Sequence, residues 1–205
     1  MSNKSIEKNV RTEQCVRRGK ILIITGPSGV GKDTVMNSLV SKHPEFRFCR
    51  SVTTRDKRPG ETEGVSYYFI SVEELNRMDD SGELIESIEY LGNKYGTRYD
   101  EINNTIESGN NLVMILEYHG MEQIKSEYHD DVVNVFMLPP SIKELERRIR
   151  NRGRDTEDQI AERLNNARNE IATSKEYSYF VINKDVEQTA EEIYHIVKGE
   201  MTFES

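Results

Sequence analysis

The segment Gly26–Thr34 reads Gly-Pro-Ser-Gly-Val-Gly-Lys-Asp-Thr and follows the apolar run Ile21–Ile24 after a single threonine. This order predicts a buried strand, a glycine-rich turn and a helix that starts near Lys32. Such a turn points successive backbone N–H groups at an anion, with the positive end of the helix dipole behind them. An ordinary strand-to-helix turn is the alternative, but the matching strand and helix argue against it. The predicted nucleotide-phosphate site consists of Gly26, Pro27, Ser28, Gly29, Val30, Gly31, Lys32, Asp33 and Thr34.

The residue after Lys32 departs from the usual pattern, which has a serine or threonine hydroxyl there to hold Mg²⁺. This chain has Asp33, and Thr34 lies about 100° further round the predicted helix. A carboxylate is a good ligand for Mg²⁺. Without the metal it would repel a phosphate 4 Å away by roughly 4 kcal/mol at an effective dielectric constant of 20. Asp33 therefore predicts nucleotide binding that depends strictly on Mg²⁺.

Composition narrows the class of protein. The 205 residues suit one domain with lobes or two small domains. A net charge of −8 argues against a general nucleic-acid partner, and no apolar run is long enough to span a membrane. Residues 1–19 are polar, lack the apolar stretch of a secretory signal and predict a mobile tail. Cys15 and Cys49 form no metal-spaced pattern, which favours a reduced, cytoplasmic setting.

Apolar runs and helical periodicities alternate along most of the chain and predict an α/β fold with a parallel sheet covered by helices on both faces. The expected core strands are residues 20–25, 46–52, 112–117, 132–138 and 179–182. The expected core helices are residues 32–42, 98–108, 141–151, 156–175 and 186–198. Residues 53–98 break the alternation, with a loop, short strands, a helix that begins at Ser71 and a turn at Gly92–Thr97. We interpret this segment as an inserted lobe.

Several motifs in order strongly resemble the guanylate kinase family over about residues 19–198. They are Ser51–Glu61 with Gly64, Tyr67 and Phe69; Gly82–Glu86; Gly92–Thr97; Arg148 through Arg152-Gly153; and Val181–Asn183. The resemblance implies a phosphate-loop kinase core (residues 20–52 and 99–198), a small mixed-β lobe that binds a nucleoside monophosphate (53–98) and a helical lid (142–170). Residues 199–205 are then a second tail.

The resemblance also implies a reaction, phosphoryl transfer from ATP to GMP or dGMP with Mg²⁺ as cofactor. Lys32, Arg148, Arg152 and Arg163 would be catalytic, and Asn183 would contact the adenine of ATP. The GMP-binding residues would be Ser51, Arg55, Arg58, Tyr67, Glu86, Tyr95, Gly96 and Thr97. Of these, Glu86 would accept both donors on the edge of guanine, a kind of pairing that can discriminate between bases by about 10⁴.

Two positions depart from the family pattern, and both concern the metal. The family has two acids near the end of the central strand, whereas this chain has Ile115 and Glu117. Because alternate residues of a strand share a face, we expect these two side chains to be neighbours. Asp33 and Glu117 together would then hold Mg²⁺. The four histidines form no spacing that predicts a metal site.

Two alternatives remain at this stage. The ending Gly-Lys-Asp also resembles a kinase of ribose 1,5-bisphosphate, which would not need the guanine-reading Glu86. Guanylate-kinase-like domains without activity also serve as binding modules, and Asp33 and Ile115 fit a catalytically weak form. Intact Lys32 and the intact GMP motifs favour the kinase. The sequence gives no indication of the oligomeric state.

Overall fold

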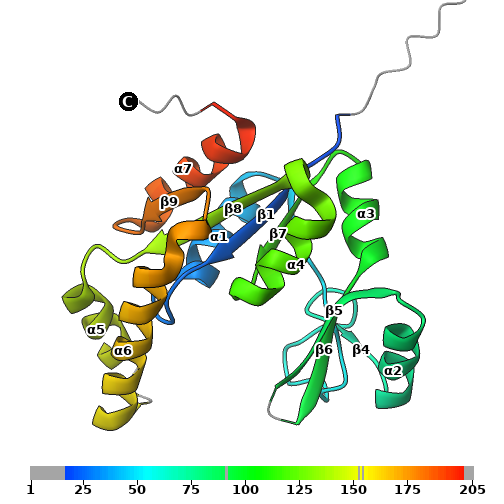
Figure 1. The fold of residues 1–205 in the computed structure, drawn as a ribbon, viewed down its shortest axis with the longest axis horizontal. Coiled ribbons are helices and arrows are strands. Elements are labelled where there is room, and N and C mark those ends of the chain that lie inside the picture. Colours follow the sequence, from blue (N-terminus) through cyan, green and yellow to red (C-terminus); the bar gives the residue numbers. More distant parts are fainter. Residues whose placement is uncertain (1–16, 91, 152, 154, 201–205) are drawn as a thin grey trace, which may run out of the picture.

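The computed structural model describes residues 17–90, 92–151, 153 and 155–200 (Figure 1). A five-stranded parallel sheet forms the centre, in the order β2-β7-β1-β8-β9. Its strands are β1 (Ile21–Thr25), β2 (Phe46–Phe48), β7 (Asn111–Ile115), β8 (Val132–Leu138) and β9 (Tyr179–Ile182). All four pairings are parallel, and Ile21 of β1 pairs with Leu112 of β7 and Val132 of β8. The predicted parallel α/β core is therefore confirmed.

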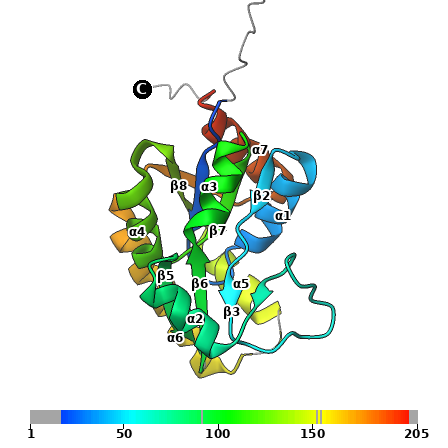
Figure 2. The same cartoon turned by 90° about the vertical axis from the view of Figure 1, so that its right-hand side faces the viewer.

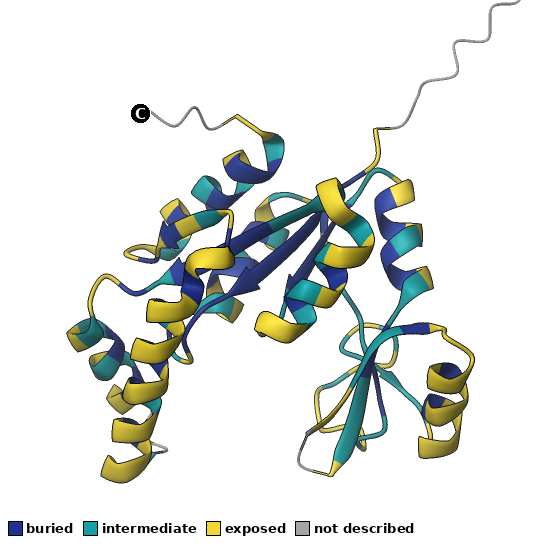
Figure 3. Ribbon diagram, viewed as in Figure 1, coloured by how far each residue is buried: buried dark blue, intermediate teal, exposed yellow. Residues whose placement is uncertain are grey.

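Helices cover both faces of this sheet, and β1 shows why. Its residues alternate between two apolar clusters, so Leu22 and Ile24 face one layer of helices while Ile21 and Ile23 face the other. The first layer contains α1 (Lys32–Lys42) and α7 (Val186–Lys198), and the second contains α3 (Tyr99–Glu107) and α4 (Tyr118–Tyr128). The central strands are dark blue in Figure 3, as expected for strands buried on both faces.

Helices α5 (Ile142–Asn151) and α6 (Glu157–Thr173) form a hairpin with a small core of its own. That core comprises Leu145, Ile149, Ile160, Leu164 and Ala167. Thr156 and Gln159 form a reciprocal capping box that fixes the start of α6. The hairpin extends away from the main sheet (Figure 1), and a 3₁₀ turn at Ser174–Glu176 leads into β9.

A second, four-stranded sheet lies below the main sheet in the view of Figure 2. Its order is β4-β3-β6-β5, with β3 (Val52–Thr53), β4 (Tyr68–Phe69), β5 (Leu84–Tyr90) and β6 (Asn93–Arg98). β3 pairs parallel with β4 and antiparallel with β6, so the sheet is mixed. Helix α2 (Val72–Asp80) packs Leu75 and Met78 against it. This bears out the predicted mixed-β insertion.

Three local predictions are wrong. Residues 46–52 are not one strand, because β2 ends at Phe48 and Val52 belongs to the small sheet. The segment Gly92–Thr97 is mostly strand β6 rather than a turn; its turn-like composition is overridden by pairing with β3 and β5. In addition, β7 ends at Ile115, so Glu117 is not a strand residue.

Glu117 is instead the N-cap residue of α4, a helix that the sequence did not predict. Only Met121 and Ile124 of α4 are buried, so its apolar periodicity is too weak to detect. Within the described part of the chain, no helix has the length and apolar character needed to cross a membrane. A short 3₁₀ helix, His129–Asp131, joins α4 to β8.

Candidate active site

The phosphate loop between β1 and α1 has the backbone that its glycines predict. Gly26 has a φ of 145°, and a Cβ there would come within 2.4 Å of the Met137 carbonyl oxygen. Gly31, the N-cap of α1, has a φ of 102° and offers no side chain to the first N–H groups of the helix. The positive end of the α1 dipole therefore faces the loop, as expected of a phosphate site at a helix N-terminus.

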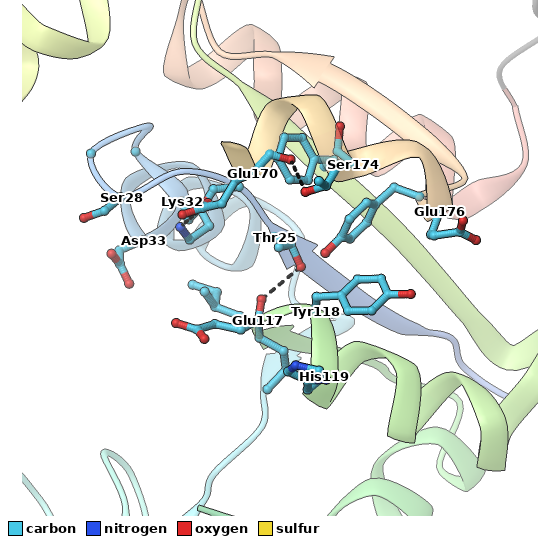
Figure 4. A pocket seen from close by; sticks show the side chains of 18 residues that line it. Thr25, Ser28, Lys32, Asp33, Glu117, Tyr118, His119, Glu170, Ser174 and Glu176 are labelled. Carbon is cyan, nitrogen blue, oxygen red and sulfur yellow. Dashed lines mark hydrogen bonds between the residues drawn. The ribbon is translucent and has the colours of Figure 1, made fainter. Parts of the chain in front are cut away.

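A cavity of about 740 Å³ opens beside this loop (Figure 4). It is bounded by the loop, by the start of α4 and by the end of α6. Its volume lies within the range of about 300–1,000 Å³ that is typical of small-molecule sites. Gly26, Ser28, Gly29, Gly31, Lys32 and Asp33 line it, whereas Thr34 does not. Pro27 and Val30 are buried and do not line the cavity.

Lys32 folds back over the loop. Its Nζ donates to the carbonyl oxygens of Gly26 and, at 3.4 Å, of Pro27. The ammonium group therefore lies inside the loop, beside the donors that face the cavity. Figure 4 shows Asp33 next to it, with its carboxylate in the same cavity. Asp33 is exposed, so solvent weakens its field.

Glu117 reaches the same cavity from the other side, from the start of α4. Ile115 also lines the cavity, although the two residues are not strand neighbours as predicted. The described residues contain no group of three or more acidic, histidine or cysteine side chains that could hold a metal alone. Mg²⁺ needs no such cage, because one or two carboxylates with water and substrate phosphates suffice. Asp33 and Glu117 beside a phosphate site fit this donor set.

The cavity also contains residues that were not singled out as functional from the sequence, and three of them lie near the phosphate loop or Glu117. Glu170 extends from α6 toward Lys32, and Tyr118 and His119 follow Glu117 on α4 (Figure 4). Partial desolvation raises the pKa of Glu170; Lys32 opposes this shift, whereas Glu117 adds to it. Glu170 follows Arg163 by seven residues, which places both on one face of α6. This spacing is the feature of the sequence that could have indicated a functional role for Glu170.

The predicted lid arginines contact the phosphate loop directly. Arg148 on α5 donates to the carbonyl oxygens of Val30 and Asn183, each at 3.0 Å, and its Nε donates to Glu144. Arg163 on α6 donates to Ser28 Oγ at 3.1 Å and pairs with Asp155. The predicted catalytic residue Arg152 lies outside the described residues. The hairpin therefore meets the loop through two of the three predicted arginines.

Asn183 follows β9 and its side chain is buried, with 3% exposure. Its Nδ2 donates to the Val30 carbonyl oxygen at 2.8 Å, and its Oδ1 accepts from Thr189 at 3.4 Å. The amide thus braces the phosphate loop from behind. A Cβ on Gly31 would lie 2.7 Å from this amide nitrogen, which shows how closely the two segments pack.

A cluster of predicted GMP ligands lies on the small sheet. Arg55 forms a two-pronged ion pair with Glu61, with N–O distances of 2.7 and 3.1 Å. Its guanidinium carbon lies 5.5 Å from the ring centre of Tyr67 and 5.7 Å from that of Phe69. Tyr67 in turn packs edge-on against Tyr95. A guanidinium and two phenols are thus brought together on one sheet, and they can bind an anion.

A second group on the same sheet surrounds Glu86. Thr97 Oγ1 donates to Glu86 Oε1 at 2.9 Å. Gly96 is buried, and a Cβ there would lie 2.8 Å from Leu84 Cδ1, so this position has no room for a side chain. Ser51 is half-buried at the start of β3. Arg58 is exposed, and its backbone N–H donates to Glu61. The groups around Arg55 and Glu86 do not line the cavity at the phosphate loop.

The family profile of guanylate kinase matches residues 18–200, nearly the whole described chain. The chain belongs to the guanylate kinase family. The guanylate kinase of a Nostoc species is 42% identical over 92% of this chain and 94% of its own length. That of Streptococcus thermophilus is 40% identical over 89% of this chain and 88% of its own.

A solved structure agrees with this assignment. The crystal structure of guanylate kinase from Anaplasma phagocytophilum superposes with a TM-score of 0.67 at 32% identity. The alignment covers 91% of this chain and 89% of that protein. The family and the fold predicted from the motifs are therefore confirmed.

Proposed function

We propose that this guanylate kinase family member transfers a phosphoryl group from ATP to GMP, giving ADP and GDP. The observation that carries the proposal is the pair of half-sites in one chain. One is the phosphate loop with Lys32 in its cavity. The other is the small sheet, where Glu86 lies beside Thr97 and Arg55 lies beside Tyr67, which packs against Tyr95. Neither a kinase of ribose 1,5-bisphosphate nor an inactive binding module would require both of these half-sites.

In this proposal the phosphate loop binds ATP. The backbone of residues 26–34 would surround the triphosphate, and Lys32 would turn from the loop carbonyls to the outer phosphates. Asn183 would lie near the adenine, although its side chain is engaged with Val30 in the structure. We therefore assign its contribution to the position of the loop and of the neighbouring backbone.

The small sheet would bind GMP. Arg55, Arg58, Tyr67 and Tyr95 would hold its phosphate, since arginine offers paired donors and tyrosine a directed one. Glu86 would accept the ring N–H and the exocyclic amino group of guanine. Ser51, Gly96 and Thr97 would surround the same base. Adenine has a lone pair where guanine has the ring N–H, so it would leave the carboxylate poorly paired.

Mg²⁺ would be held by Asp33 and Glu117 together with the phosphates of ATP. When bound, it neutralises charge on the phosphates and orients them. Asp33 would otherwise add to the negative charge at the site. This is why we expect stricter metal dependence than a hydroxyl at residue 33 would give.

The chemistry needs alignment and charge neutralisation rather than a general base, because the attacking GMP phosphate is already an anion. Arg148, Arg152 and Arg163 on the α5–α6 hairpin would stabilise the charge on the transferred group. We propose that this hairpin is the lid, and that residues 53–98 are the lobe that approaches it. Closure would exclude water that could hydrolyse ATP.

The test is ADP formation by the purified protein with GMP, dGMP, AMP or ribose 1,5-bisphosphate as acceptor. We expect turnover with GMP and dGMP. The Glu86→Gln variant places an amide donor against a guanine donor, and we expect it to lose about 10²-fold or more in kcat/KM for GMP. Turnover with the sugar bisphosphate alone, or GMP binding without turnover, would contradict the proposal.

A further inference from the structure

The first turn of α4 lies directly against the carboxylate of Glu86. Gly120 is the third residue of this helix, and a Cβ built on it would lie 2.8 Å from Glu86 Oε2. The other carboxylate oxygen, Oε1, accepts from Thr97 on the opposite side. Glu86 is thus held between β6 and α4, and Gly120 provides the space on the α4 side.

The backbone gives no reason for glycine at this position. Gly120 is helical and is not among the glycines with positive φ. A glycine inside a helix costs about 1 kcal/mol relative to alanine. Its other near neighbours, the Cβ and Cδ1 atoms of Leu116, would lie at 3.6 Å from a Cβ, which is ordinary contact. Replacing Gly120 with alanine would therefore fill the space beside Glu86.

The same turn also reaches the other half-site. Glu117, Tyr118 and His119 line the cavity at the phosphate loop. Ile85 of β5 packs against the apolar cluster that contains Met121 and Ile124 of α4, so β5 is fixed relative to α4 next to Glu86. The Glu86 carboxylate also lies at the amino-terminal end of α4, where the helix dipole favours an anion. The start of α4 thus forms a wall shared by both half-sites.

We propose that Gly120 is a specificity-determining residue for the acceptor nucleotide: its missing side chain lets the Glu86 carboxylate align with both donors of guanine. The inference rests on the proposed function, in which Glu86 binds the base. An added methyl group would meet the far end of a flexible side chain rather than backbone. Glu86 would therefore shift, and the fold would persist.

The test is the Gly120→Ala variant, measured with GMP and with inosine monophosphate, which lacks the exocyclic amino group. We expect KM for GMP to rise about tenfold, corresponding to about 1.4 kcal/mol. KM for ATP should stay within twofold, and the preference for GMP over inosine monophosphate should fall. Ser126→Ala, also on α4 and exposed, is the matched control and should change none of these values.

A double-mutant cycle with Glu86→Asp separates this effect from a general disturbance. The shorter aspartate carboxylate clears the added methyl group, so the two losses in GMP affinity should combine to less than their product. Independent, fully multiplicative losses would overturn the inference. So would an unchanged GMP preference in Gly120→Ala, or a lower melting temperature with equal losses for GMP and ATP. Absence of GMP turnover in the unaltered protein would instead refute the proposed function.

Discussion

Arg148 joins the α5–α6 hairpin to the phosphate loop, and removing it should loosen both. Its guanidinium donates to the Val30 and Asn183 carbonyl oxygens, which belong to segments far apart in sequence. The Arg148 side chain is 23% exposed, so these bonds are only partly open to water. We predict that Arg148→Ala destabilises the protein and slows the reaction.

The magnitude follows from the contacts. A hydrogen bond to a charged group contributes about 1.5–3 kcal/mol. Two such bonds are lost, but Val30 keeps its second donor, the Asn183 amide, and water can replace part of the rest. We therefore expect the free energy of unfolding to fall by about 2–4 kcal/mol, near the low end of the sum of the two bonds.

Urea denaturation of the nucleotide-free protein measures this change, and Arg147→Ala is the matched control. Arg147 lies on the same helix and pairs with the same Glu144, but its side chain is 62% exposed, and within the described part of the chain it donates to Glu144 rather than to the loop. Exposed ion pairs contribute about 0–1 kcal/mol. If both variants lose the same free energy, within about 0.5 kcal/mol, the bonds of Arg148 to the loop do not stabilise the fold as we argue.

Two further predictions concern charge. Asp33→Ser restores the hydroxyl of the usual motif, yet we expect weaker use of Mg²⁺ in titrations of ADP formation, because Asp33 and Glu117 act together; an improved response to the metal would contradict this. Glu144 has a pKa lowered to about 2 by hydrogen bonds from Arg147 and Arg148. A lowered pKa stabilises the fold above the unfolded value of 4.5 and loses this effect as the pH falls toward 2. Glu144→Gln should therefore be less stable than the unaltered protein at pH 7, with a difference that disappears in that window; a difference that is independent of pH would count against the assignment.

Sequence patterns correctly predicted the strands and loops whose conformation depends on neighbouring residues in the chain. Four apolar residues in a row predicted β1, and all four are buried. The glycines and Lys32 predicted a loop whose backbone only glycine readily adopts at Gly26 and Gly31. The motifs around Arg55 and Glu86 predicted the family, and the family profile confirms it. The metal-binding and substrate-binding roles of these residues remain predictions for the experiments above.

The sequence misplaced segments whose structure depends on distant partners. β6 contains glycine and polar residues typical of a turn, and only its pairing with β3 and β5 makes it a strand. Glu117 was assigned to the central strand because an apolar run precedes it. The chain leaves the sheet after Ile115, and α4, whose pattern is weak, begins directly after Glu117.

The phosphate loop and the alternation of strands and helices could be predicted from the sequence, because they follow from backbone conformation and apolar spacing over a few residues. The family could be predicted because several of its motifs occur in order along the chain. The contact of Asn183 with Val30, 153 residues away, and that of Gly120 with Glu86 could be seen in the folded chain alone. The physical reason is that a hydrogen bond or a close approach depends on where packing brings two atoms. No spacing along the chain encodes that position.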